Sequence, residues 1–367
     1  MPTPPPCEFI SLGAIIKSFH VGKTNVVLGF SSQDLYITHN SPHFGENIGR
    51  VANRIANAQI NSLNQKSYPL AKNDGVNSLH GGVVGWGKKI WDGPTPVGKR
   101  ETGVLPLLQD SSECVVFKLR SKDGDEGYPG SVEAQVFYTT GKQYENGKEI
   151  NLLIMEYEVF FSEDDTSEIE ETVVNMTNHS YGFKDSSQGT KANPNLNSYF
   201  NISGSSTIDG TIVTLSSNTH LPVDDGGIPI STTPVSCSSF TANKPFTLGA
   251  IEPNFDHCFI VDPTPGLQIP LDSRSSPLKL LVTAFHPQTK IHLEVFSTEP
   301  AFQFYTGQHI DVPAVEGTPA RGSRAGFCVE PSRYIDAINR EEWRDQVILK
   351  KGQVYGSRIV YKAWSDE

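Results

Sequence analysis

The chain has 367 residues, of which 37% are hydrophobic and 19% are charged, the composition of a folded globular protein and not of a disordered one. Its net charge of −11 repels phosphate backbones, so we expect no nucleic-acid partner. The five cysteines are odd in number, widely spaced and without a CxxC pair, which argues against a disulfide framework or a zinc knuckle.

The N-terminal stretch MPTPPPCEFI has no basic segment followed by an apolar one, so it does not resemble a signal peptide. No apolar run approaches the length that a membrane span needs. We therefore expect a cytoplasmic protein, monomeric or homodimeric, that does not bind membranes.

Short runs rich in Val, Ile, Phe, Tyr and Thr dominate the chain and are separated by turn residues, among which are 32 glycines and 25 prolines. In chain order, the clearest predicted strands are 24–30, 113–120, 132–140, 150–161, 211–215, 279–285, 290–298 and 356–364. One helix is predicted over 31–39, with Ser31 or Ser32 as its N-cap. Two long loops are expected at 231–242 and 312–326. This pattern predicts an all-β protein of antiparallel strands, and without a linker or a short repeat we expect one domain over 1–367.

Polar residues gather beside glycines at several places. The first segment, IGRVANRIANA, contains Asn53 and Arg54, and in NSLHGG a glycine pair after His80 would let the backbone approach a ligand closely. The acidic stretch DGDEGYPG lacks the ligand offsets of a calcium loop, so we interpret it as a tight turn.

Two titratable residues further along stand in unusual surroundings. His179 lies among hydrogen-bonding neighbours just after an apolar strand in VVNMTNHSYGFK, and Glu330 lies among apolar neighbours in GFCVEPSRY. From the residues alone, His179 could be a satisfied histidine in a polar turn, and Glu330 could be a strand residue that points to solvent.

Taken together, the sequence resembles the aldose 1-epimerases, the mutarotases, from about Leu12 to about Trp364. Eight blocks in the order of that family carry the resemblance: FGENIGRVANRIANAQI, NSLHGGVVGWGKKIW, DGDEGYPG, VVNMTNHSYGF, LPVDDGGIP, NFDHCFIV, QFYTGQHID and GFCVEPSRYIDAIN. The resemblance implies a large twisted antiparallel β-sandwich, the mutarotase-like supersandwich, with few short helices and an open cleft for one sugar.

The resemblance also implies roles for individual residues. His179 would be the general acid and Glu330 the general base, whereas sugar hydroxyls would be contacted by Asn53, Arg54, His80, Asp256 and Gln303, with Tyr181 as a further wall of the cleft. Two departures from the family pattern, Gly182 and Pro331, leave the preferred sugar open.

Ring opening of a hemiacetal needs a base at the C1 hydroxyl and an acid at the ring oxygen, so one group must be unprotonated while the other is protonated. Glutamate and histidine, with ordinary pKa values of ~4.3 and ~6.5, suit this pairing. A nearby carboxylate would keep His179 protonated, and Asp256 is our candidate. The chemistry needs no metal and no cofactor, only a small-molecule sugar.

Other interpretations remain open at this point. The same scaffold could bind a carbohydrate without catalysis, could act on an unusual or phosphorylated hemiacetal, or could be a lyase or hydrolase if Asp256 were a second carboxylate in register. The remaining histidines are interpreted as ordinary surface or turn residues: His20, His39, His43, His220, His286, His292 and His309. Trp86 and Trp91 are expected in the core or the cleft wall.

Overall fold

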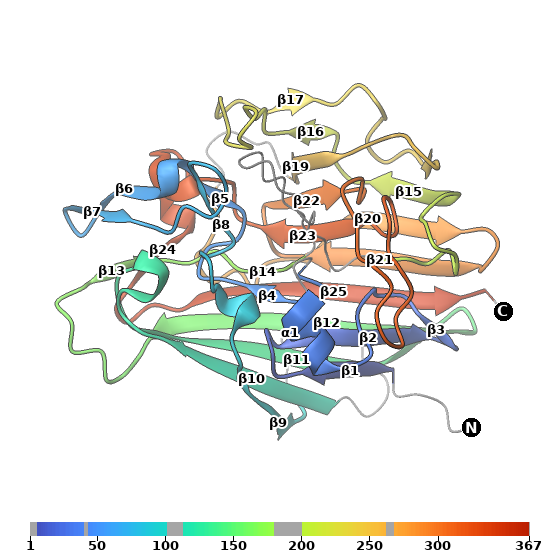
Figure 1. Ribbon diagram of the computed structural model, residues 1–367, viewed down its shortest axis with the longest axis horizontal. Coiled ribbons are helices and arrows are strands. Elements are labelled where there is room, and N and C mark those ends of the chain that lie inside the picture. The colour runs from blue at the N-terminus through green and yellow to red at the C-terminus, as the bar shows by residue number, and fades with distance from the viewer. Residues whose placement is uncertain (1–5, 40–42, 101–112, 180–199, 262–267, 367) are drawn as a thin grey trace.

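The computed structural model describes residues 6–39, 43–100, 113–179, 200–261 and 268–366, and two antiparallel sheets form its main layers (Figure 1). The larger sheet has nine strands in the spatial order β18 (Phe246–Leu248), β15 (Thr211–Leu215), β20 (Lys279–His286), β21 (Ile291–Ser297), β25 (Tyr355–Ser365), β12 (Lys148–Phe161), β11 (Val132–Glu145), β10 (Glu113–Ser121) and β9 (Asp92–Gly98). The smaller sheet has five, in the order β17 (Val235–Ser236), β16 (Thr219–His220), β19 (Asp256–Ile260), β22 (Ala301–Tyr305) and β23 (Cys328–Ser332).

The register of the long strands follows from their turns and their alternation. Strands β11 and β12 pair from Val132 opposite Phe161 to Glu145 opposite Lys148. Asn146 and Gly147 connect them, and both have a positive φ, as the type I′ turn of a two-residue hairpin requires. In β15 and β21, buried and partly exposed residues alternate strictly, which is the pattern of a sheet with one face in the core.

The main apolar core lies between the two sheets. Phe259, Phe302 and Phe304 of the smaller sheet belong to the same buried cluster as Val213, Leu293, Val295 and Ile359 of the larger one. On the opposite face of the smaller sheet, Cys258 and Ala301 belong to a second cluster. This arrangement confirms the predicted β-sandwich, and it leaves the second face of the smaller sheet available for a site.

Short elements cover these layers. They are the three-stranded sheet of β1 (Cys7–Ile10), β2 (Ile15–Val21) and β3 (Thr24–Asn25); the pairs β14 (Thr177–Asn178) with β4 (Asn47–Ile48), β13 (Glu171–Val173) with β24 (Ile348–Lys350), β5 (Arg54–Ile55) with β8 (Ser78–Leu79) and β6 (Gln59–Leu63) with β7 (Lys66–Pro69); and the 3-10 turns η1 (Ala56–Ala58), η2 (Trp86–Lys88), η3 (Asp125–Gly127), η4 (Ala337–Asn339) and η5 (Arg344–Gln346).

The predicted helix is confirmed as α1 (Gln33–His39). The strand predicted over 24–30 is wrong beyond Asn25, because the side-chain oxygen of Asn25 accepts hydrogen bonds from the backbone N–H groups of Phe19 and Val27, in place of a regular strand ladder. The expected loop over 231–242 contains the short, exposed β17.

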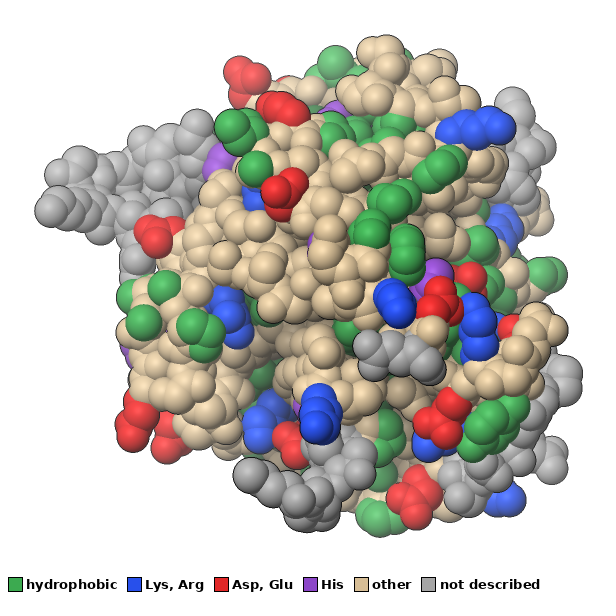
Figure 2. Space-filling model, turned by 90° about the vertical axis from the view of Figure 1, so that its right-hand side faces the viewer, with side chains coloured by type: hydrophobic (Ala, Val, Ile, Leu, Met, Phe, Trp, Pro, Cys, Tyr) green, Lys and Arg blue, Asp and Glu red, His purple; other side chains and the backbone are tan. Residues whose placement is uncertain are grey.

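Two further expectations concern the described residues. The five cysteines are all free thiols, and no helix in the described parts is long and apolar enough to cross a membrane. On the face shown in Figure 2, acidic and basic side chains are interspersed, so the net charge is not concentrated there.

Candidate active site

The smaller sheet places three of the predicted site residues on one face. Gln303 lies opposite Cys258 on one side and opposite Glu330 on the other, and Asp256 is two residues before Cys258. Because paired residues of an antiparallel sheet share a face, all these side chains project away from the main core. Gln303 Nε2 donates to Asp256 Oδ1 at 2.6 Å, and Gln303 is buried, like every other residue of β22.

Glu330 is buried, with 2% of its surface exposed. Burial, reinforced by the charge of Asp256 and opposed by that of Arg54, raises the pKa of Glu330 well above its ordinary value. Its Oε1 atom has no hydrogen-bond partner within the described part of the chain. A buried carboxyl oxygen left without a partner is costly in a structural role, and it is what a base waiting for a substrate hydroxyl needs.

His179 follows β14 directly, is fully buried, and contacts His80 through their Nε2 atoms at 2.8 Å. The backbone N–H of Asn53 donates to His80 Nδ1 at 3.2 Å, which leaves Nε2 as the protonated nitrogen of a neutral His80. His80 therefore donates to His179, whose Nε2 is the acceptor.

The segments that carry His179 and Glu330 run beside each other. Strand β14 packs against β23. Just before β14, the side-chain amide of Asn175 accepts from the backbone N–H of Arg333 at 2.9 Å and donates to the Arg333 carbonyl at 3.4 Å. Glu330 thus lies on a strand beside the one that His179 directly follows, although the two residues are distant in sequence.

Asn53 and Arg54 lie between the residues of the smaller sheet and the two histidines. Asn53 Nδ2 donates to Gln303 Oε1, and Arg54 donates to Asn53 Oδ1, both at 3.5 Å. Arg54 Nε also donates to Asp74 Oδ2 at 2.6 Å. Gly227, with φ +74°, lies against this guanidinium, since a Cβ there would be 2.9 Å from Arg54 Nε.

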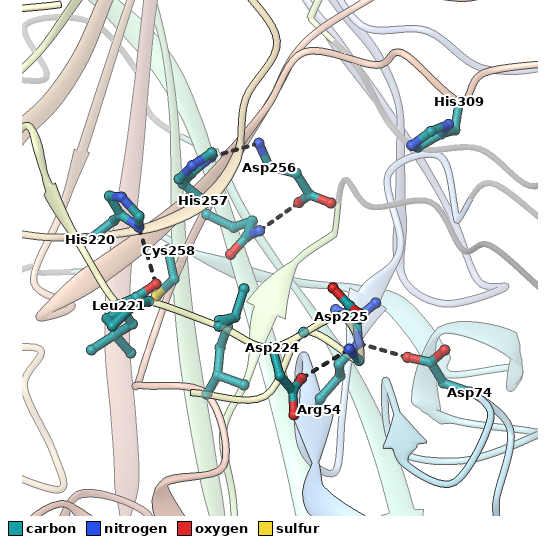
Figure 3. Close-up of a pocket in the computed structure, with 16 residues that line it drawn as sticks. Arg54, Asp74, His220, Leu221, Asp224, Asp225, Asp256, His257, Cys258 and His309 are labelled. Carbon is teal, nitrogen blue, oxygen red and sulfur yellow. Dashed lines mark hydrogen bonds and ion pairs between the residues drawn. The ribbon is translucent and has the colours of Figure 1, made fainter. Parts of the chain in front are cut away.

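A cavity of about 820 Å³ opens beside these residues (Figure 3). Arg54, Asp256 and Gln303 line it, whereas Asn53, His80, His179 and Glu330 are buried next to them. The block LPVDDGGIP, to which the sequence analysis assigned no role, supplies residues 221–227 of the wall. In the described part of the chain, no group of three or more His, Cys, Asp or Glu is arranged to hold a metal ion.

Three residues of the site have left-handed backbones: His43 at φ +59°, Asn53 at +60° and His80 at +52°. Such conformations are uncommon for residues other than glycine and cost free energy, so they persist where the surrounding structure imposes them. Their grouping here indicates that the fold holds these side chains in set orientations.

The expectation that a carboxylate keeps His179 protonated is wrong for this structure. The pKa of His179 is well below its ordinary value because of burial, and the neighbouring His80, His43 and Lys88 lower it further. Asp256 acts on the other member of the pair, since its charge helps to raise the pKa of Glu330.

The glycine pair after His80 serves the chain's own packing. A Cβ at Gly81 would overlap the Gly49 carbonyl, and one at Gly82 would overlap the Glu126 carboxylate. Trp86 is buried and packs edge-on against Trp91, so it is a core residue. Tyr181 and Gly182 lie outside the described residues.

Sequence reasoning missed His43, which was assigned to the surface. Its ring centroid lies 4.9 Å from that of His179 and 5.6 Å from that of His80. It also missed Asp74, the partner of Arg54. One feature of the sequence could have indicated His43 as a site residue. It directly precedes the block that carries Asn53 and Arg54.

Several known proteins are similar to this chain. The sequence matches the aldose 1-epimerase family over residues 6–184 and 182–362. It is 33% identical over 368 residues to the galactose mutarotase of Bos taurus, covering 97% of this chain and 90% of that protein. It is 35% identical over 359 residues to the bifunctional protein gal10 of Schizosaccharomyces pombe, covering 97% of this chain but 43% of that longer protein. The chain thus spans less than half the length of some of the curated relatives that it matches.

Solved structures show the same fold. A GalM/aldose epimerase homologue from C. elegans superposes with a TM-score of 0.73 at 20% identity, over 98% of this chain and 96% of that one. A galactose 1-epimerase from Lactobacillus acidophilus gives a TM-score of 0.70 at 20% identity, over 98% and 91%. With the family match extending over nearly its whole length, the chain belongs to the aldose 1-epimerase family.

Proposed function

We propose that this chain interconverts the α and β anomers of a hexose of the glucose or galactose type by acid- and base-assisted ring opening. The observation that carries the proposal is Glu330, a buried carboxyl with an oxygen without a hydrogen-bond partner in the described chain, on a strand beside the one that ends at the buried imidazole of His179. Relatives named galactose mutarotases support this choice of reaction.

In the proposed reaction, Glu330 removes the proton of the C1 hydroxyl while His179 protonates the ring oxygen. The C1–O5 bond breaks and an open-chain aldehyde forms. After rotation about C1–C2, the hydroxyl at C5 attacks the other face of the aldehyde, His179 takes back its proton and Glu330 returns one to O1. No net proton is consumed, and each positioned transfer typically contributes about 10²–10⁴ in rate.

For the proposed reaction, Glu330 and His179 together must carry one titratable proton. The pKa of Glu330 is raised and that of His179 is lowered, so near neutrality the ligand-free pair favours a neutral carboxyl and a neutral imidazole over the charged form. Both forms hold the same number of protons and give the same bell-shaped dependence of kcat/KM on pH. The substrate must take the place of the contact between the Nε2 atoms of His80 and His179, because the ring oxygen has to meet that nitrogen.

The remaining residues orient the sugar. Arg54, Asp256 and Gln303 face the cavity and offer donors and acceptors to hydroxyl groups, while His80 and Asn53 are within hydrogen-bonding reach of these groups or of His179. A phosphorylated substrate is less favoured, because the lining contains Asp74, Asp224, Asp225 and Asp256 beside Arg54.

Polarimetry with freshly dissolved α-glucose and α-galactose tests the proposal. We expect the wild-type chain to accelerate the decay of optical rotation, and Glu330→Gln and His179→Asn each to lose about 10²–10⁴ of that acceleration. Glu113→Gln, which removes an exposed carboxylate, is the matched control and should leave the rate unchanged. A wild-type chain that binds the sugar but leaves mutarotation at its buffer rate would identify a carbohydrate-binding protein instead.

A further inference from the structure

A carboxylate that the proposed reaction does not use is buried beside the histidines. Glu46 is fully buried and accepts from Lys88 Nζ through Oε1 at 2.6 Å. Its other oxygen, Oε2, lies 2.6 Å from Nδ1 of His43. Since a carboxylate accepts, His43 Nδ1 is the protonated nitrogen, and Nε2 carries the lone pair when the ring is neutral.

This group is built onto the strand pair that ends at His179. Strand β4 pairs with β14, and the backbone N–H of His179 donates to the Glu46 carbonyl at 2.7 Å. The His43 ring in turn lies against both His179 and His80. A displacement or a charge change at residues 43–46 therefore acts directly on the imidazole that follows β14.

Gly87 leaves the space that the Glu46 carboxylate occupies. A Cβ at Gly87 would overlap Glu46 Oε2, and the glycine precedes Lys88, the second partner of this carboxylate. The side chain of His43 is 24% exposed, whereas His179 is fully buried. His43 is thus the histidine of the cluster that solvent protons reach most readily.

We propose that His43, Glu46 and Lys88 form a charge-coupled array that sets the pH range over which His179 carries a proton. The array acts through His179, so its members are positioning residues and not catalytic ones. The inference rests on the proposed role of His179 in ring opening, and it assigns the control of that role to residues outside the sugar-facing wall.

The charges around the rings of His43 and His179 determine the direction in which each substitution should shift their titrations. The charges of Glu46 and Lys88 act on His43. His80 and His43 act electrostatically on His179, and the charge of Arg54 acts on His80. The ammonium lowers the pKa of both His43 and His179, and the carboxylate raises that of His43. Removing the ammonium should therefore move both titrations to higher pH, whereas neutralising Glu46 leaves the ammonium uncompensated and should move them to lower pH.

NMR titration of the imidazole resonances of His43 and His179 in the full chain measures the effect of the array without turnover. The pH profile of kcat/KM then measures its effect on activity. We expect Lys88→Met to shift the titrations and the histidine limb of the profile to higher pH, Glu46→Gln to shift them to lower pH, and Lys88→Arg to restore wild-type behaviour.

Lys89→Met is the matched control, because it removes the same charge one residue along, where the ammonium pairs with Asp125. Equal shifts in Lys88→Met and Lys89→Met, or shifts of the same sign in Lys88→Met and Glu46→Gln, would overturn the proposal. If Lys88→Met does not fold, the sign of the Glu46→Gln shift alone decides. Shifts of the expected signs in a chain that shows no mutarotation would retain the array and reject the proposed function.

Discussion

The two halves of the site are built by different means. The carboxylate half, with Asp256, Gln303 and Glu330, lies on three neighbouring strands of one sheet, and its side chains meet because the strand register puts them on one face. In the histidine half, His80 and His179 directly follow two-residue strands, and His43 and His80 have left-handed backbones. The first half depends on regular pairing, and the second on contacts between segments far apart in the chain.

The difference appears in their electrostatics as well. Burial raises the pKa of Glu330 and lowers that of His179, so both halves are pushed toward their neutral forms. The proposed ring opening tolerates this, because a proton leaves one of the two groups as another enters the second group. The following experiments separate the two halves, from the largest expected effect to the smallest.

The largest effect tests whether the halves act as one unit. Glu330→Gln and His179→Asn should each reduce kcat by about 10²–10⁴, and the double variant should lose little more than the worse single variant, because groups that act together are not additive. Polarimetric kcat values for the three proteins check this. Losses that multiply in the double variant would show two independent contributions.

Arg333 joins the halves, since its backbone holds Asn175 while its Nε pairs with Glu299 Oε2 at 3.0 Å. Both side chains are fully buried. Arg333→Met should lower the free energy of unfolding by about 3–5 kcal/mol, because it leaves a buried carboxylate unpaired. Denaturant titration measures the loss, and the second change Glu299→Gln should recover part of it. A loss that the double variant does not reduce would contradict the pairing.

Glu330 should make the fold less stable as pH rises. Its pKa is raised in the folded state, so the unfolded chain ionises first, and the free energy of unfolding falls from pH ~4.3 upward until the raised folded pKa is reached. Glu330→Gln should therefore raise the melting temperature at pH 8 and not at pH 4. Thermal scans at both values decide, and an equal change at both would show a packing effect.

Asp256→Asn tests the coupling within the carboxylate half. The charge of Asp256 raises the pKa of Glu330, so its removal should lower that pKa and move the carboxylate limb of the kcat/KM profile to lower pH. An asparagine oxygen can still accept from Gln303, so orientation is retained. A limb that stays in place would assign Asp256 to sugar binding alone.

The smallest effect concerns the wall that supports Arg54. Gly227→Ala places a Cβ 2.9 Å from the guanidinium at φ +74°. We expect a several-fold rise in KM with little change in kcat, since Arg54 is proposed to orient the sugar. Gly98→Ala is the matched control, because Gly98 has φ +72° and no atom within 4 Å of the added Cβ. An equal rise in both variants would mean that backbone strain alone is responsible.

The strands of the larger sheet could be predicted from the sequence better than the three strands of the carboxylate half, none of which is among the clearest predicted strands. Strand-length runs with turn residues between them predicted most of the long strands, and β11 and β12 even exceed their expected lengths. Glu330 stood out as an acidic residue among apolar neighbours, but the residues alone also allowed a strand residue that points to solvent. The prediction over 24–30 failed because a side chain, Asn25, took hydrogen bonds that the backbone pattern assigned to a strand.

The histidine half of the site was hard to predict from the sequence. The resemblance to a family named His80 and His179, but nothing in the spacing of His43, Glu46 and Lys88 indicated that they meet. Glu46 reaches Lys88 across 42 positions, and His179 reaches His80 across 99. Local patterns describe neighbours in the chain, and these contacts join segments whose approach depends on the whole sandwich.

The amino-acid sequence by itself determined the all-β class, because alternation and turn chemistry are local properties. Its resemblance to the aldose 1-epimerases supplied the candidate acid and base. Only the tertiary structure decided the directions in which the pKa values of Glu330 and His179 shift and the contacts of His43 with Glu46 and the other two histidines. Both depend on the distances between groups and on burial, which removes water from around a charge, and neither can be read from the order of residues along the chain.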